Sequence, residues 1–180
     1  MPRAARDAAP DLDLLERRWR ATAPIDDGTI HLLVVRVGNG RHDTPARLEL
    51  SPEDAVAGDR WPTDPRGFPD TQVSLIERRV VELVAGPDRS RWHLPGDNLV
   101  VDLDLSLAAL PVGTHLRAGT ARIEITAKPH TGCTKFRARL GDEAFRWVNA
   151  PEHRDRRLRG VYARVVAPGI IAATDRVVRG

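Results

Sequence analysis

Short apolar segments separated by turn residues make up most of the chain and predict a mainly β protein. Residues 30–37 are rich in β-branched and aliphatic side chains between two glycines, which predicts a largely buried strand. The clearest hairpin signal lies at residues 114–117 and 120–126, because apolar and polar positions alternate in the second segment. Further strands are expected at residues 46–50, 99–103, 160–167 and 170–178. Many short strands with turns between them predict a β-barrel.

Helical periodicity is limited to short segments. Leu12, Leu15 and Trp19 lie at helical spacing and predict a short helix near the N-terminus. The charged, Ala- and Pro-rich residues 1–10 before it are expected to be disordered. We therefore predict an N-terminal tail with a short helix over residues 1–28 and a single β-barrel domain over residues 29–180.

A second helix is expected after a capping-box pattern. Ser74 is followed three residues later by Glu77, a spacing that lets the two side chains bond each other's backbone amides at a helix start. Apolar residues follow at helical spacing, and Gly86-Pro87 predicts the end of the helix. A third helix is expected from about Asp142. The sequence thus predicts a closed barrel with two or three peripheral helices.

The composition is that of a globular protein of one domain. The chain has 180 residues, of which 41% are hydrophobic and 29% charged. It has no apolar run of the length needed for a signal peptide or a membrane span, so we expect a cytoplasmic protein that does not act at a membrane.

The positive net charge of +3 raises the question of nucleic-acid binding. The basic residues are almost all arginines and are spread over the whole chain, and the one dense cluster, residues 153–159, contains an acid. Few aromatic residues are interleaved with the arginines to stack on bases. A solvated helix face explains this cluster best, with the binding of small anions second and nucleic-acid binding third, so we expect no nucleic-acid partner.

The single cysteine, Cys133, lies in a segment that contains His130, Gly132 and Lys135. A nearby cation stabilises a thiolate, the form that attacks electrophiles and binds metals. A lone cysteine can equally be a small buried residue in a loop. One cysteine excludes an internal disulfide framework and a cysteine-rich zinc site, and the histidines do not occur at metal-ligand spacing. The residues of this loop leave the reactive and the buried thiol both open.

Several segments, in this order, resemble the MOSC domain, the module at the C-terminus of molybdenum-cofactor sulfurases. These segments are Gly58-Asp59-Arg60-Trp61, Gly96-Asp97-Asn98-Leu99-Val100, residues 110–119, residues 121–126 with the cysteine loop, and residues 159–165. The resemblance covers the chain from about residue 30 to the C-terminus and identifies it as a stand-alone member of this family.

The resemblance implies a compact MOSC-type closed β-barrel, similar to the pyruvate kinase barrel, with a cleft in which one cysteine carries the chemistry. In the family this cysteine relays sulfur destined for a metal centre, and in reductase relatives it ligates the molybdenum of a bound cofactor. Cys133 matches this position. It is therefore expected to be both the catalytic residue and the metal ligand, with the molybdenum cofactor, molybdopterin, as the bound group.

The same resemblance suggests which residues bind the cofactor. Asp59 matches the acidic residue of a Gly-Asp turn, and Asn98 matches an asparagine that opens a strand. The remaining expected cofactor-binding residues are charged or polar side chains that can stabilise the thiolate or pair with a phosphate, namely Arg60, His130, Lys135 and Arg137, with Arg139 nearby. For any single arginine, plain solubility is the competing explanation.

Three positions depart from the family pattern. Gly132 precedes the cysteine where many members have proline, Asp97 stands where an arginine often precedes the asparagine, and Thr174-Asp175 replaces a Gly-Asp pair. The sequence also shows no aminotransferase-like domain. We therefore expect no pyridoxal phosphate site, and no desulfuration of free cysteine by this chain itself.

Two functions remain open at this point. The first is a cofactor-binding or sulfur-carrying protein that depends on Cys133, as a component of a molybdenum-dependent reductase or as a sulfur transferase. The second is a non-catalytic small-molecule binding module on the same barrel, with Cys133 structural. The expected partners are a small-molecule cofactor or a sulfur donor or acceptor, together with a redox or sulfurase protein.

Overall fold

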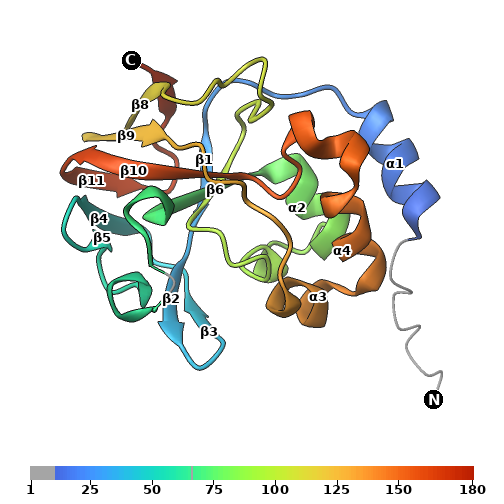
Figure 1. The fold of residues 1–180 in the computed structure, drawn as a ribbon, viewed down its shortest axis with the longest axis horizontal. Coiled ribbons are helices and arrows are strands. Elements are labelled where there is room, and N and C mark those ends of the chain that lie inside the picture. The colour runs from blue at the N-terminus through green and yellow to red at the C-terminus, as the bar shows by residue number, and fades with distance from the viewer. Residues whose placement is uncertain (1–10, 66) are drawn as a thin grey trace.

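The computed structural model describes residues 11–65 and 67–180 (Figure 1). The disorder expected for residues 1–10 lies outside this part of the chain. The helices within it are α1 (Leu12–Ala21), α2 (Arg78–Ala85), α3 (Thr134–Leu140) and α4 (Asp142–Asn149). The strands are β1 (Ile30–Leu33), β2 (Val35–Gly38), β3 (Arg41–Asp43), β4 (Arg47–Ser51), β5 (Ala55–Val56), β6 (Val73–Glu77), β7 (Leu99–Val101), β8 (His115–Ala118), β9 (Ala121–Ile125), β10 (Val161–Ala167), β11 (Gly169–Ala172) and β12 (Val177–Arg179).

A seven-stranded sheet in the order β1-β7-β6-β10-β9-β8-β12 forms the centre of the fold. Neighbouring strands run antiparallel except β6 and β7, which are parallel. A bridge between Thr29 and Arg176 joins the β1 edge to the β12 edge, so the sheet is nearly closed into a barrel. The predicted mainly β, barrel-like fold is confirmed.

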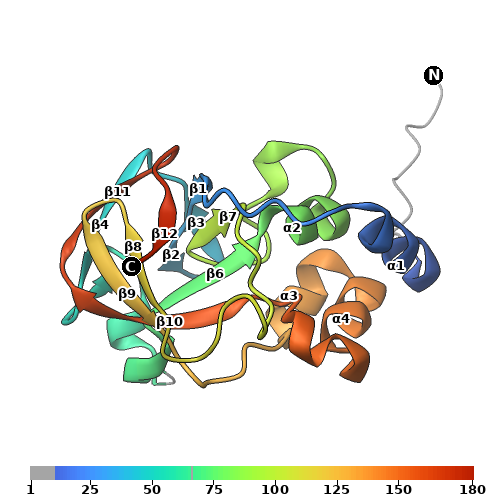
Figure 2. The same ribbon diagram turned by 90° about the horizontal axis from the view of Figure 1, so that it is seen from above.

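Alternation along the central strands separates two hydrophobic cores. Leu75, Leu99 and Val101 belong to the cluster inside the barrel, whereas Ile76 and Val100 belong to a second cluster with the helices. Successive side chains of a strand point to opposite faces, so β6 and β7 serve both cores. Figures 1 and 2 show the four helices gathered on one side of the barrel, over these strands.

The prediction that a helix begins at Ser74 is wrong about its first residue. Residues Val73–Glu77 are strand β6, and the helix begins at Arg78. The Ser74 amide and hydroxyl bond Asn98 Oδ1 at 3.0 and 3.1 Å, and Glu77 Oε1 accepts from the Leu105 amide at 3.2 Å. Both polar side chains of the capping-box pattern therefore have tertiary partners, and pairing with β7 and β10 decides the conformation.

Most other local predictions agree with the structure. The β8–β9 hairpin forms as predicted, but Ala118 pairs with Ala121, so its two-residue turn is Gly119-Thr120, one residue later than expected. The strand predicted over residues 30–37 is interrupted at Val34, whose amide donates to the Asn98 carbonyl at 2.8 Å. Helix α3, directly after Cys133, lies where only a loop was expected. Within residues 11–65 and 67–180, every helix is too short or too polar to cross a membrane.

Candidate functional site

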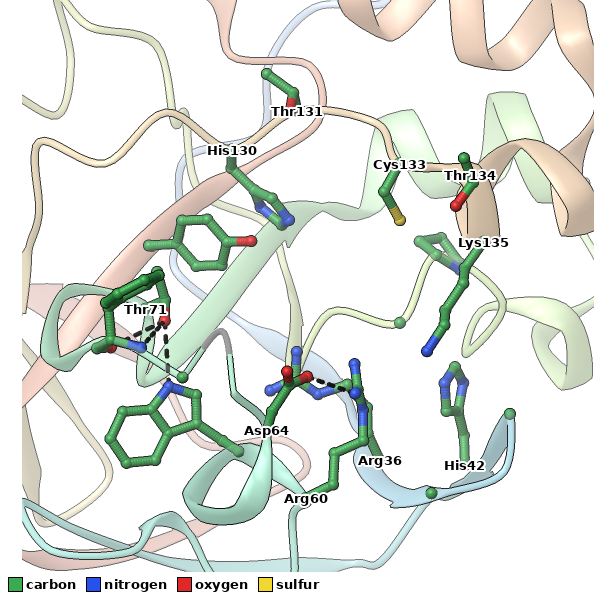
Figure 3. A pocket seen from close by; sticks show the side chains of 18 of the residues that line it. Arg36, His42, Arg60, Asp64, Thr71, His130, Thr131, Cys133, Thr134 and Lys135 are labelled. Atoms are coloured by element: carbon green, nitrogen blue, oxygen red, sulfur yellow. Dashed lines mark hydrogen bonds and ion pairs between the residues drawn. The ribbon is translucent and has the colours of Figure 1, made fainter.

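The structure contains a pocket with a volume of about 980 Å³. Its wall comes from segments far apart in the sequence: the β2–β3 hairpin, residues 60–65 and 67–71, the loop at Gly96, and residues 128–135. Side chains from these segments surround one central space (Figure 3). The fold therefore places the predicted cysteine loop opposite the β2–β3 hairpin and residues 60–65, which both carry arginines.

Cys133 lies in the wall of this pocket with an exposed side chain. It is the N-cap residue of α3, and its carbonyl accepts the Arg137 amide at 3.0 Å. Figure 3 shows its sulfur pointing into the pocket. The interpretation of Cys133 as a small buried residue is therefore wrong, and the thiol is accessible to a ligand or a partner.

Gly132 explains one departure from the family pattern. Its amide donates to Asn149 Oδ1 at 2.8 Å, and an added Cβ would lie 2.8 Å from Asn149 Nδ2 and 3.2 Å from Phe145 Cδ2. A proline has no amide hydrogen to donate, and a Cβ at this position would crowd side chains of α4. Helix α4 thus fixes the backbone directly before the cysteine.

Positively charged side chains predominate in the pocket wall. The cationic residues that line it are Arg36, Arg41, Arg60, Lys128, Lys135, Arg139 and Arg159. Among the described lining residues, Asp64 supplies the one carboxylate, and it accepts from Arg60 Nη1 at 2.5 Å. An excess of cations in a concave site attracts anions, and guanidinium groups suit phosphate and carboxylate oxygens.

The cations differ in how firmly they are held. Lys135 is exposed and points into the pocket, and its ammonium has no ion pair with the residues that the structure describes (Figure 3). Arg139, in contrast, donates to the carbonyls of Leu94 and Gly40 at 3.2 and 3.1 Å. Burial lowers the pKa of Arg139, while the nearby Cys133 favours its charged form. Hydrogen bonds therefore fix Arg139 in the wall, whereas no ion pair with the described residues holds Lys135.

His42 is held between Arg139 and His93 in the wall. Its Nδ1 lies 2.8 Å from the His93 carbonyl oxygen, and its Nε2 lies 3.1 Å from Arg139 Nη1. Burial, followed by the charge of Arg139, lowers the pKa of His42 to about 4. A neutral His42 therefore connects the β2–β3 hairpin to the end of α3.

His130 is also neutral, which corrects one expectation. Its side chain is 6% exposed, and its ring packs against Tyr162 with 4.1 Å between centroids. Burial lowers the pKa of His130 well below its usual value, and the charges of Arg159 and Arg36 lower it further. Burial therefore disfavours the charged form of His130 that was expected to stabilise the Cys133 thiolate.

Two expected cofactor-binding residues lie behind the wall. The Asp59 carboxylate accepts from Arg36 Nε and Nη2 at 2.9 and 3.0 Å and from the Trp61 amide at 2.9 Å. The buried Asn98 donates through Nδ2 to Asp59 Oδ2 at 3.2 Å. Neither residue lines the pocket, and together they fix the position of Arg36.

The other residues expected to bind the cofactor lie partly in the pocket wall and partly outside it. Arg60 and Lys135 line the pocket with Cys133 and His130, whereas Arg137 lies outside the lining and pairs with Asp142 at 2.5 Å. Sequence reasoning assigned no site role to several side chains of the wall, among them Arg36, His42, Arg159 and Tyr162. Two signals were available: an arginine inside the apolar run at residues 30–37, and the place of Arg159 and Tyr162 in the family-like segment 159–165.

Comparison with known proteins decides the family. The MOSC domain family matches residues 62–178. The chain is a member of the MOSC domain family. None of the curated proteins compared with it gives a match.

Solved structures share the fold of this MOSC domain. YiiM from Escherichia coli is 20% identical, with a TM-score of 0.56 over 84% of this chain and 69% of that protein. YuaD from Bacillus subtilis is 17% identical, with a TM-score of 0.53 over 82% of this chain and 92% of that protein. YiiM from Geobacillus stearothermophilus is 17% identical, with a TM-score of 0.52 over 87% and 75% of the two chains. At such identities the similarity establishes the fold alone.

Proposed function

We propose that this MOSC domain binds the molybdenum cofactor in the cationic pocket, with the Cys133 thiolate as the protein ligand of the metal. The observation that carries the proposal is the exposed Cys133 thiol in the same wall as seven cationic side chains. A soft thiolate suits a transition metal, and the cations suit the phosphate of a pterin.

The pocket fits such a group in size and chemistry. Its volume of about 980 Å³ lies at the upper end of the range for cofactor sites. Trp61, Phe68 and Tyr162 add apolar surface to the charged wall, as a planar ring system requires. When bound, the cofactor would supply the redox chemistry, and the protein would supply its binding and orientation.

The protein's own residues have separate tasks in this proposal. Arg36 and Arg139 are held by hydrogen bonds and orient an anionic group, while Lys135, which has no ion pair with the described residues, adjusts to it. Asp59 and Asn98 act as positioning residues for Arg36 and do not contact the ligand. A reductase activity also requires a redox partner protein, and a sulfurase would supply sulfur in the alternative role.

Metal analysis tests the proposal directly. Protein purified from a host that makes the cofactor is expected to contain molybdenum at about one atom per chain, because a site with its ligands in place retains its metal. Cys133→Ser is expected to lose most of it, whereas Arg137→Gln, outside the pocket, keeps it. Molybdenum equally bound by Cys133→Ser would refute ligation by this residue.

Sulfur carrying is the second candidate, because Cys133 is exposed and lies at the junction of a loop and a helix. A persulfide on Cys133 without bound molybdenum would favour this role. The non-catalytic binding module is favoured instead if Cys133→Ser leaves ligand binding unchanged. Alkylation of Cys133 in the native protein is a first test of whether the thiol is accessible, as both candidate roles require. An exposed thiol is expected to react without denaturant.

A further inference from the structure

Three buried polar atoms beside the pocket have no hydrogen-bond partner among the described residues: Asp97 Oδ1, His130 Nδ1 and Arg159 Nε. Buried polar atoms are rarely left unpaired, so each needs an explanation. The first two lie 3.5 Å apart, close to hydrogen-bond distance. His130 Nδ1 and Asp97 Oδ1 therefore face each other.

The charge of Asp97 decides which nitrogen of His130 carries the proton. Asp97 Oδ2 accepts from Arg159 Nη1 at 2.5 Å, and a guanidinium stays protonated in proteins. Burial raises the pKa of Asp97, while Arg159 opposes this change. With Asp97 ionised by this ion pair, the neutral imidazole places its proton on Nδ1, toward the carboxylate.

The other ring nitrogen, Nε2, is then an unprotonated acceptor. His130 lines the pocket, and Figure 3 shows its ring pointing into the central space. Stacking on Tyr162 holds the ring in this orientation. His42, the other histidine of the wall, has both nitrogens engaged within the protein and offers no such acceptor.

The arginines and lysines of the lining can only donate, and its threonine and tyrosine hydroxyls can donate as well as accept, whereas the unprotonated Nε2 is a neutral side-chain group that can only accept. We propose that His130 Nε2 selects anions that carry a hydrogen-bond donor, such as a protonated phosphate, over anions that have only acceptors. An anion without a proton would place an oxygen lone pair against the Nε2 lone pair. This inference rests on the proposed function only because both concern the same pocket.

Hydrogen phosphate and sulfate are the probes, because at about pH 8 they have the same charge and similar shape, but only hydrogen phosphate has an O–H group. Titration calorimetry of the full chain is expected to show phosphate binding at least about tenfold tighter than sulfate. His130→Phe keeps an aromatic ring against Tyr162 but has no acceptor, and it is expected to bind the two anions equally. His115→Phe, the same substitution at an exposed histidine of β8, is expected to keep the preference.

Equal binding of the two anions by the wild-type protein would overturn the inference, as would an unchanged preference in His130→Phe. If that variant does not fold, nitrogen NMR of the wild-type imidazole decides, and a proton on Nε2 would refute the assignment. Either failure leaves the proposed function intact, since that depends on molybdenum bound through Cys133.

Discussion

Arg159 Nη1 lies 2.5 Å from Asp97 Oδ2 in a part of the protein where both side chains are at most 5% exposed. Arg159 also donates through Nη2 to the Pro95 carbonyl at 3.0 Å. This ion pair joins the start of β10 to the loop before β7 and lies directly behind His130. Asp97 departs from the arginine common in the family, and its partner is an arginine 62 residues later in the chain.

Removing one member of this buried pair is expected to destabilise the protein strongly. Arg159→Leu leaves the Asp97 carboxylate buried without its partner, which costs about 3–5 kcal/mol in the free energy of unfolding. Chemical denaturation measures the change. Arg164→Leu is the matched control, because Arg164 pairs with Glu124 at 2.8 Å but is 55% exposed. A loss above about 1 kcal/mol in the control would contradict the comparison of buried and exposed pairs.

Stability is expected to fall as the pH is lowered from about 6.5 toward 4. The folded-state pKa of His42 is about 4, whereas an unfolded histidine has a pKa near 6.5. Between these values the unfolded chain binds more protons, so His42 contributes stability that is present above pH 6.5 and is lost as the pH falls. The maximal slope is about 1.4 kcal/mol per pH unit for one proton, and partial exposure of His42 reduces it.

Denaturation curves at several pH values check this dependence. His42→Gln is expected to have a shallower slope than the wild type, because one proton fewer is taken up on unfolding. His115→Gln serves as the control, since this exposed histidine lies outside the pocket. Identical slopes in the wild type and His42→Gln would remove His42 as a source of the dependence.

Thr174→Gly is expected to stabilise the protein. Thr174 has a φ of +85°, a left-handed conformation that is unfavourable for a β-branched residue and that glycine adopts freely. Relief of this strain, less the greater flexibility of glycine in the unfolded chain, gives a gain of about 1 kcal/mol. Thermal denaturation measures it, and Thr174→Ala is expected to give little gain because alanine also has a Cβ. A lower melting temperature for Thr174→Gly would contradict the strain argument.

Gly132→Pro is expected to destabilise the segment before Cys133, although it introduces the residue that many relatives have. The substitution removes the 2.8 Å hydrogen bond to Asn149 Oδ1 and adds atoms where α4 is close. The expected cost is about 1–3 kcal/mol. In a double-mutant cycle, Asn149→Ala should lower this cost, and strictly additive effects would show that the two residues do not interact.

Local sequence patterns predicted the elements whose side-chain periodicity agrees with the final fold. The β8–β9 hairpin and helix α1 have clear alternation or helical spacing, and the structure forms them as expected. The capping-box pattern at Ser74 failed, because Asn98 and the neighbouring strands supply stronger partners than a helix start would. A local motif decides a conformation only where tertiary partners do not compete for the same groups.

The sequence by itself determined the barrel-like fold and the family, and it singled out Cys133 as the candidate for the chemistry. Those features depend on periodicity and on ordered motifs that can be read along the chain. Only the tertiary structure decided that Arg36, Arg139 and Arg159 line the same pocket as the cysteine and that Asp59 and Asn98 lie behind Arg36. It also decided that His130 is neutral, because burial and the charge of distant residues determine a pKa, and neither is encoded in local spacing.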